Sequence, residues 1–137
     1  DGVILSAGDS SAIQGAAQLV GAGITQDRNV ANIRLLYATP NDDVAVLKSS
    51  LEAAATHNWC VVWDVSHKTT NNFHPAQDTM LAPKVISIGS FSDSMPGWRV
   101  GWMAGSEMAD KLRAYKQSMT ICSTSISQWA GMGLTEE

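Results

Sequence analysis

The feature that most constrains the fold is an alternation of short apolar runs with segments whose apolar residues recur at helical spacing. Five runs have the length and composition of β-strands, at residues 3–7, 33–38, 59–63, 85–89 and 98–104. Helical spacing follows the first, second and last runs, at residues 12–20, 44–57 and 106–119, and a last helix is expected at 125–134. Strands that alternate with helices are typical of a mostly parallel sheet covered by helices. The sequence therefore predicts a three-layer α/β/α fold with a mostly parallel sheet of about five strands.

Length and composition predict one soluble globular domain covering residues 1–137. A chain of 137 residues is long enough to bury a core but short for two independent ones. With 45% hydrophobic and 16% charged residues it is too apolar for a disordered chain, and no apolar run approaches the roughly 20 residues that span a bilayer. The net charge of -4, without a cluster of Lys or Arg, argues against nucleic-acid and membrane partners.

The two cysteines and the amino-terminal residue bear on the compartment. Cys60 and Cys122 lie in apolar stretches and lack the spacings of zinc sites or disulfide frameworks, which predicts buried, reduced thiols. No secretory signal opens the chain, so we expect a cytoplasmic protein. The chain begins with Asp1 rather than Met, which suggests processing or excision from something longer.

Two features, each taken alone, are weak indications of a ligand. The Gly-Asp-Ser-Ser turn at residues 8–11 opens a helix, whose N–H groups and dipole would suit an anion such as phosphate. A serine after a glycine equally often serves only to start a helix. Asp64 ends the most apolar strand at its carboxyl edge, where open parallel sheets bind ligands. It could hold a cationic ring nitrogen, or act only as a capping or salt-bridged aspartate.

A longer motif is more specific. Residues 90–93 are Ser-Phe-Ser-Asp, and residues 96–102 are Pro-Gly-Trp-Arg-Val-Gly-Trp. They resemble the signature of the class I/II aminotransferases, fold-type I enzymes that depend on pyridoxal phosphate, in which Ser-Phe-Ser-Lys precedes Pro-Gly-Trp-Arg. Other segments match in order: 8–13 resembles the glycine-rich turn under the cofactor phosphate, 38–41 the run into Asn-Pro-Thr-Gly, 63–64 the Asp-Glu-x-Tyr strand end, and 106–137 the helix after the signature. The resemblance covers nearly the whole chain and concerns the cofactor-binding large domain only.

The resemblance implies a cofactor, a reaction and four binding residues. Asp64 would match the carboxylate that keeps the pyridine nitrogen protonated. Ser10, Ser90 and Arg99 would match the phosphate cup, with Arg99 making a charge-assisted contact. The family transfers amino groups between an amino acid and a keto acid. The resemblance thus implies non-covalent pyridoxal phosphate, these small-molecule substrates if the chain is active, and a homodimer or other homo-oligomer. It supplies no catalytic residue, and no metal ligand is expected.

Several departures from the family bear on the reaction. Asp93 stands where the family has the lysine that forms the internal imine, and a carboxylate forms no imine. The domain is therefore predicted to be incomplete or inactive as an aminotransferase. The spacer before Pro96 is two residues short, Asn41 is followed by acids rather than by Pro-Thr-Gly, and His67 replaces a tyrosine.

The chain also lacks the small domain and a long insert with two strands, of which only residues 21–32 remain. Because the missing strands would lie beyond the edge of the sheet, the five remaining strands would still be contiguous. In this interpretation the first helix crosses from one edge of the sheet to the other, about 19 Å for four strand spacings of about 4.8 Å. A linker of about a dozen residues can reach that far when extended.

Other side chains near the expected site are weaker candidates. Lys68, beyond Asp64, is a better substitute for the missing lysine than Lys84 at the opposite edge, but a solvated loop lysine is the commoner case. His67 and His74 share the same polar loop and could act as bases or simply be solvated. The five tryptophans are expected in the core and at interfaces rather than on a cofactor, and they are Trp59, Trp63, Trp98, Trp102 and Trp129.

Three hypotheses remain open. The first is the cofactor-binding part of an aminotransferase. The second is a non-catalytic domain, natural or engineered, that keeps the fold and acts through self-association, because the missing parts would leave apolar surface bare. The third is an unrelated phosphate-ligand binder on a flavodoxin-like sheet, which leaves the 90–102 motif unexplained and ranks last.

Overall fold

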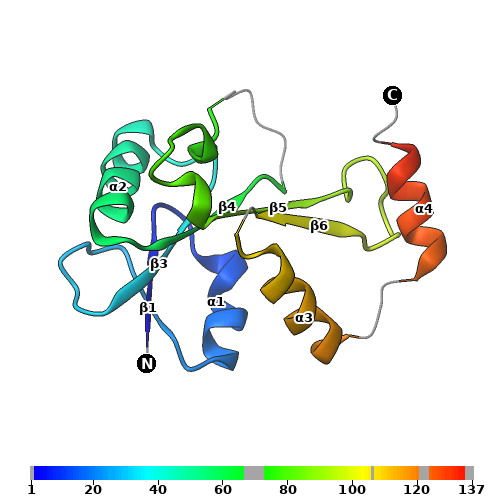
Figure 1. The fold of residues 1–137 in the computed structure, drawn as a ribbon, viewed down its shortest axis with the longest axis horizontal. Coiled ribbons are helices and arrows are strands. Elements are labelled where there is room, and N and C mark those ends of the chain that lie inside the picture. Colours follow the sequence, from blue (N-terminus) through cyan, green and yellow to red (C-terminus); the bar gives the residue numbers. More distant parts are fainter. Residues whose placement is uncertain (1, 67–72, 106, 121–123, 135–137) are drawn as a thin grey trace.

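The computed structural model of the chain describes residues 2–66, 73–105, 107–120 and 124–134, which form one sheet between two layers of helices (Figure 1). The strands are β1 (Val3–Ser6), β2 (Gly23–Thr25), β3 (Ile33–Ala38), β4 (Cys60–Asp64), β5 (Val85–Ser90) and β6 (Gly101–Gly105). The helices are α1 (Ser11–Leu19), α2 (Val44–His57), α3 (Ala109–Met119) and α4 (Ser125–Gly133), with two 3-10 turns, η1 (Pro75–Gln77) and η2 (Ala82–Lys84). The predicted α/β/α fold is confirmed.

The sheet has the order β2-β1-β3-β4-β5-β6. Strands β1 to β5 run parallel, and β6 runs antiparallel to β5 with Ser90 opposite Gly101. The carboxyl ends of β1 to β5 and the amino end of β6 therefore lie along one rim, called the carboxyl edge below. This is the edge at which a mostly parallel sheet places its ligands.

The sheet has one strand more than the five runs in the sequence, and the expected path of the first helix is wrong. The sheet has six strands because Gly23–Thr25 in the polar stretch after α1 pairs with β1. The first helix also does not cross the sheet, since β1 pairs directly with both β2 and β3. The chain leaves β1, returns through α1 to the neighbouring position, and then passes back over β1 to β3. This short path needs no 19 Å crossing.

The main core lies between the sheet and α2. Strand side chains alternate between the two faces, and Leu36, Val61 and Trp63 are buried on the α2 face with Leu47 and Leu51 of the helix. Asp43 starts α2, because its carboxylate accepts hydrogen bonds from the N–H groups two and three residues later, both at 3.0 Å. Asn58 ends the helix in the left-handed conformation. This face positions β3 and β4.

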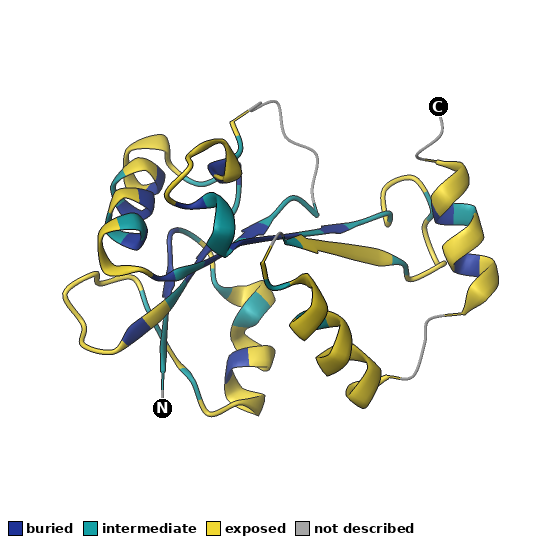
Figure 2. Cartoon of the chain, viewed as in Figure 1, coloured by how far each residue is buried: buried dark blue, intermediate teal, exposed yellow. Residues whose placement is uncertain are grey.

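The opposite face of the sheet is covered more thinly by α1 and α3 (Figure 2). Ala17 is the only buried residue of α1, and the described part of α3 buries none. Helical spacing puts four large apolar residues on one side of this segment, namely Met108, Leu112, Tyr115 and Met119. Tyr115 and Met119 are nevertheless 70% and 72% exposed. Only the first half of this stripe lies against the sheet, because Met108 and Leu112 are partly buried and the sulfur of Met108 is 3.9 Å from that of Cys60 on β4.

The other sequence expectations have mixed outcomes. Trp59 and Trp63 are buried as predicted, whereas Trp98, Trp102 and Trp129 are exposed. Cys60 is a free, half-buried thiol whose pKa is raised by burial. Cys122 and Ser106 lie outside the described residues.

Candidate functional site

Asp64 is an acidic side chain held in a fixed orientation at the carboxyl edge. It is the last residue of β4, and its Oδ2 accepts a 2.6 Å hydrogen bond from the hydroxyl of Tyr37 on β3. Its Oδ1 accepts a 2.8 Å bond from the backbone N–H of Ser66. Because strand side chains alternate, Asp64 points to the face opposite Trp63, where the helical cover is thin. A carboxylate with two fixed donors keeps its orientation.

The pKa of Tyr37 is affected by its contact with Asp64. The tyrosine is 3% exposed and reaches Asp64 from the neighbouring strand β3. Burial raises the pKa of Tyr37, and the hydrogen bond to Asp64 and the negative charge of Asp64 raise it further. The phenol therefore remains a hydrogen-bond donor over the whole physiological range.

Ser90 and Arg99 lie next along the same edge. Ser90 ends β5, and its Oγ accepts a 3.0 Å bond from the N–H of Ser92. Arg99 precedes β6 by two residues, is exposed, and has a positive φ of 54°. Such a φ is uncommon for a residue with a side chain and follows from the tight reversal through Gly97. Asp64, Ser90 and Arg99 thus occupy three adjacent strand ends.

Ser10 does not join these three residues, which corrects the predicted four-residue constellation. It follows β1, and β1 lies four strand positions from β6. At about 4.8 Å per strand, Ser10 and Arg99 are separated by roughly 19 Å of sheet. One phosphate group is far smaller than that distance, so these two residues cannot share it.

In the turn before α1, the carboxylate of Asp9 already occupies the position expected for a phosphate. The N–H of Ser11 donates to Oδ1 of Asp9 at 2.9 Å, and the Ser11 hydroxyl donates to Oδ2 at 2.8 Å. These bonds lower the pKa of Asp9. Asp42 lies against the same turn, because a Cβ at Gly8 would collide with its carboxylate. The predicted phosphate turn therefore carries two carboxylates.

His74 is a structural residue rather than a base. Its Nδ1 accepts the N–H of Ala76 at 3.1 Å, so Nε2 carries the proton of the neutral ring and donates to the Ser87 hydroxyl at 2.9 Å. Burial lowers the pKa of His74, which keeps the ring neutral. Ser87 is 8% exposed, so this histidine–serine pair is closed to substrates.

The remaining candidates are remote or lie beyond the described residues. Lys84 precedes β5 and belongs to the opposite edge, as expected. His67 and Lys68 lie outside the described residues, so their interpretation as a base and as a substitute lysine stays a prediction. Asp93 is described, and it is exposed in the turn that follows β5.

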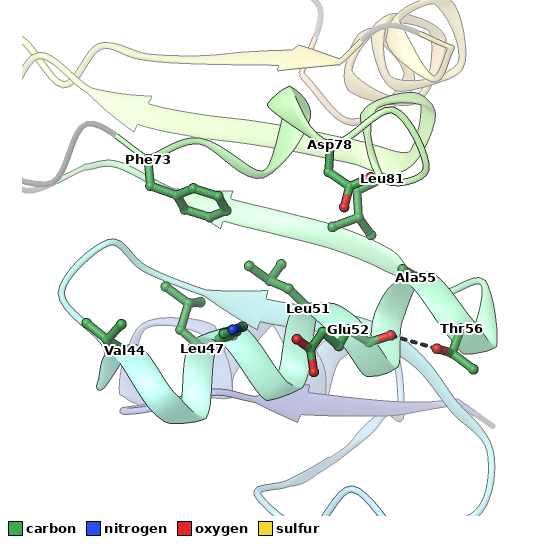
Figure 3. Close-up of a pocket in the computed structure, with 10 residues that line it drawn as sticks. Val44, Leu47, Leu51, Glu52, Ala55, Thr56, Phe73, Asp78 and Leu81 are labelled. Carbon is green, nitrogen blue, oxygen red and sulfur yellow. Dashed lines mark hydrogen bonds between the residues drawn. The ribbon is translucent and has the colours of Figure 1, made fainter.

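A groove of about 680 Å³ opens on the α2 side of the molecule (Figure 3). Apolar side chains of α2 form one wall, and Phe73 and Leu81 form the other. Glu52 and Asp78 are its acidic residues, and Lys48 is its basic one. Asp64 points to the other face of the sheet, so the groove and the carboxyl-edge residues are separate features. Sequence reasoning missed this groove, because it depends on how the segment after residue 72 folds back over α2.

Two kinds of feature are missing from the part of the chain that the structure describes. No group of three or more His, Cys, Asp or Glu residues there could hold a metal ion. No helix among those residues is long and apolar enough to cross a membrane.

Comparisons with known proteins agree with this architecture. No protein-family model matches the sequence, and no curated protein sequence matches it significantly. Solved structures do match. One is an aspartate aminotransferase double mutant from Thermus thermophilus, with 18% identity and a TM-score of 0.77, in a match that covers 96% of this chain and 42% of that one. Another is a PLP-dependent aminotransferase from Streptococcus suis, with 18% identity and a TM-score of 0.72, in a match that covers 95% of this chain and 42% of that one. A third is α-aminoadipate aminotransferase LysN from Thermus thermophilus, in complex with N-(5'-phosphopyridoxyl)-L-leucine. It has 21% identity and a TM-score of 0.75, and the match covers 99% of this chain and 43% of that one.

The chain therefore has the fold of a core portion of PLP-dependent aminotransferases and spans less than half the length of those structures. At this level of identity the likeness establishes the fold.

Proposed function

We propose that this chain is an aminotransferase-like domain that binds pyridoxal phosphate without a covalent bond, through Asp64, Ser90 and Arg99, and that it does not transfer amino groups by itself. The observation that carries this proposal is the Asp64 carboxylate, fixed by Tyr37 and Ser66 at the carboxyl edge. The proposal is supported by the fold, which the chain shares with structures described as PLP-dependent aminotransferases.

The residues fit the ring end of this cofactor. When bound, pyridoxal phosphate supplies an electron-withdrawing ring, and an ionised carboxylate at the ring nitrogen keeps that nitrogen protonated. Asp64 suits this task because its orientation is set by two donors from different segments. Tyr37 contributes indirectly, by holding the carboxylate rather than by contacting the ligand.

The residues also fit the phosphate end, with Ser10 excluded. Ser90 lies two residues beyond the position opposite Asp64, about 6.6 Å along the sheet. Arg99 starts from the next strand, two strands or about 10 Å from β4. A flexible arginine side chain can cover part of that distance, and its planar guanidinium suits the oxygens of a phosphate.

The covalent part of aminotransferase chemistry does not fit. Asp93 follows Ser92 in the turn after β5, and a carboxylate cannot form an imine with an aldehyde. Recognition of an amino acid or keto acid, and any amino transfer, would therefore require residues beyond this chain. We assign the domain to the cytoplasm, where the free thiol of Cys60 stays reduced.

Self-association without a ligand is the second candidate. It is favoured by large apolar side chains that remain exposed on three elements, namely Trp102 on β6, Tyr115 on α3 and Trp129 on α4. A homodimer is compatible with both candidates.

The test is cofactor retention, measured by the absorbance of pyridoxal phosphate after gel filtration and by equilibrium dialysis. Asp64→Asn and Arg99→Ala should each weaken binding roughly tenfold or more, because each removes a charge-assisted interaction. Asp110→Asn and Arg113→Ala are matched controls, since these side chains are 94% and 72% exposed on α3. Ser90→Ala should weaken binding and Ser10→Ala should not. Absence of retained cofactor in the unmodified chain would refute the proposal.

A further inference from the structure

Strand β6 is an unusually open edge. Among the strands that the structure describes it pairs on one side only, with β5. Gly101 to Ala104 are exposed, including Trp102 at 40% and Met103 at 48%. The strand carries no charge and no proline between residues 100 and 105. Natural edge strands are normally protected by such residues, and an apolar edge without them is a site for pairing with another strand.

The ladder with β5 determines which backbone groups of β6 point away from the sheet. Phe91 and Val100 are directly opposite, and the N–H of Phe91 donates to the carbonyl of Val100 at 3.0 Å. Hydrogen-bonded and non-bonded pairs alternate along an antiparallel ladder. Trp102 and Ala104 therefore bond to β5, while the N–H and C=O groups of Gly101, Met103 and Gly105 face outward.

These three outward-facing residues are symmetric about Met103. In an antiparallel pair of two β6 strands centred there, Met103 would exchange both backbone bonds with the partner's Met103, and Gly101 would do so with the partner's Gly105. Trp102 would lie opposite the partner's Ala104, a large side chain next to a small one. Two copies of β6 can therefore satisfy each other's outward-facing hydrogen-bonding groups, in a register that keeps the two Trp102 side chains apart.

Charge complementarity supports the same register. Arg99 and Glu107, both exposed, lie four residues before and after Met103. Antiparallel pairing about Met103 brings the Arg99 end of one strand beside the Glu107 end of the other, and it does so twice. A parallel pairing would instead place the two arginine ends together and the two acidic ends together.

The neighbouring helix supplies additional apolar surface. Met103 and Leu112 line one cleft between β6 and α3, so this helix flanks the same edge. A stable dimer buries about 800 Å² from each partner, which is less than a tenth of the 9190 Å² surface of this chain. A five-residue strand alone buries less than that, so the exposed Tyr115 and Met119 of α3 would have to contribute.

We propose that β6 is a self-association surface, at which two copies of this chain join their sheets by antiparallel β6–β6 pairing about Met103. The interface is isologous, with a two-fold axis through the midpoint of the strand pair. The proposal rests on the backbone pairing of β6 and shares only Arg99 with the proposed cofactor site.

Analytical ultracentrifugation over a dilution series tests the surface. Met103→Pro removes an N–H that faces outward, so the ladder with β5 stays intact while pairing is blocked. It should weaken dimerisation at least tenfold, and Met103→Leu, which keeps the N–H, should change it less than twofold. If circular dichroism shows that the proline variant is unfolded, Met103→Lys replaces it, because it places two positive charges opposite each other. A monomeric unmodified chain, or a dimer insensitive to these changes, would overturn the proposal.

Disulfide trapping tests the register. Residues in a bonded antiparallel pair have Cα atoms about 5.5 Å apart, which is within the range that a disulfide spans. With Cys60 and Cys122 replaced by serine, Met103→Cys should cross-link rapidly, whereas Ala104→Cys, which faces Trp102 instead of itself, should cross-link slowly. Glu107→Arg should weaken the dimer, and the exchanged pair Arg99→Glu with Glu107→Arg should restore it. Equal cross-linking at 103 and 104, or no restoration, would contradict the register.

Discussion

Replacing Tyr37 by Phe should destabilise the chain by removing one hydroxyl from the interior. The hydroxyl donates at 2.6 Å to Asp64, and Tyr37 itself is 3% exposed. Hydrogen bonds to charged groups contribute about 1.5–3 kcal/mol, more than neutral ones, because the carboxylate loses a donor that water replaces poorly. For a chain of this length the same loss corresponds to a fall in Tm of roughly 5 to 10 °C.

The measurement is a double-mutant cycle in urea with Tyr37→Phe, Asp64→Ala and the double variant. Because the two side chains contact each other directly, their effects should be non-additive, with a coupling energy of about 1 kcal/mol or more. Tyr115→Phe is the matched control, since Tyr115 is 70% exposed and its change should cost less than about 0.5 kcal/mol. Additive effects within about 0.5 kcal/mol, or equal losses at both tyrosines, would show that the hydroxyl does not hold Asp64.

Three further substitutions test other contacts in the structure. Because burial lowers the pKa of His74, the unfolded chain binds the proton first as the pH falls below about 6.5; stability should decline there, and denaturation of His74→Gln at several pH values should show a flatter dependence. Asp43→Ala should cost about 1 kcal/mol in urea denaturation by uncapping α2, whereas Asp43→Asn should cost much less. Trp63 is 1% exposed, so Trp63→Ala should leave a cavity in the core and lower the free energy of unfolding by about 3–5 kcal/mol. A thermal melt that shows no loss of stability would contradict the packing described.

Most of the fold could be predicted, because it depends on apolar periodicity. The strands at 33–38 and 85–90 and the helix at 44–57 coincide with apolar runs and helical spacing, and Asp43 marks the start of that helix. β2 could not be found in this way, since it is three residues long and only Ile24 is large and apolar. Strand order is a property of pairing between distant segments, so the sequence pattern left it undetermined and the expected path of α1 was wrong.

The site was predictable only in part. Asp64 was identifiable because the end of an apolar strand in a parallel sheet lies at the ligand edge. Tyr37 was not, although its hydroxyl helps to orient Asp64, because a tyrosine in an apolar strand looks like any other core residue. The helix-opening turn at Gly8 misled the interpretation, since Asp9 within the turn already accepts the N–H of Ser11.

The carboxyl edge therefore has two ends of opposite character. From β1 to β4 it carries Asp9, Asp42 and Asp64, whose charges add to the effect of burial in raising the pKa of Tyr37. At β6 it carries Arg99, beyond Ser90. Unit charges about 10 Å apart interact measurably near a protein surface, so the acidic end repels a phosphate that the arginine end attracts. A ligand with a cationic ring nitrogen and an anionic phosphate can satisfy both only when its ring points toward Asp64, which fixes one orientation along the rim.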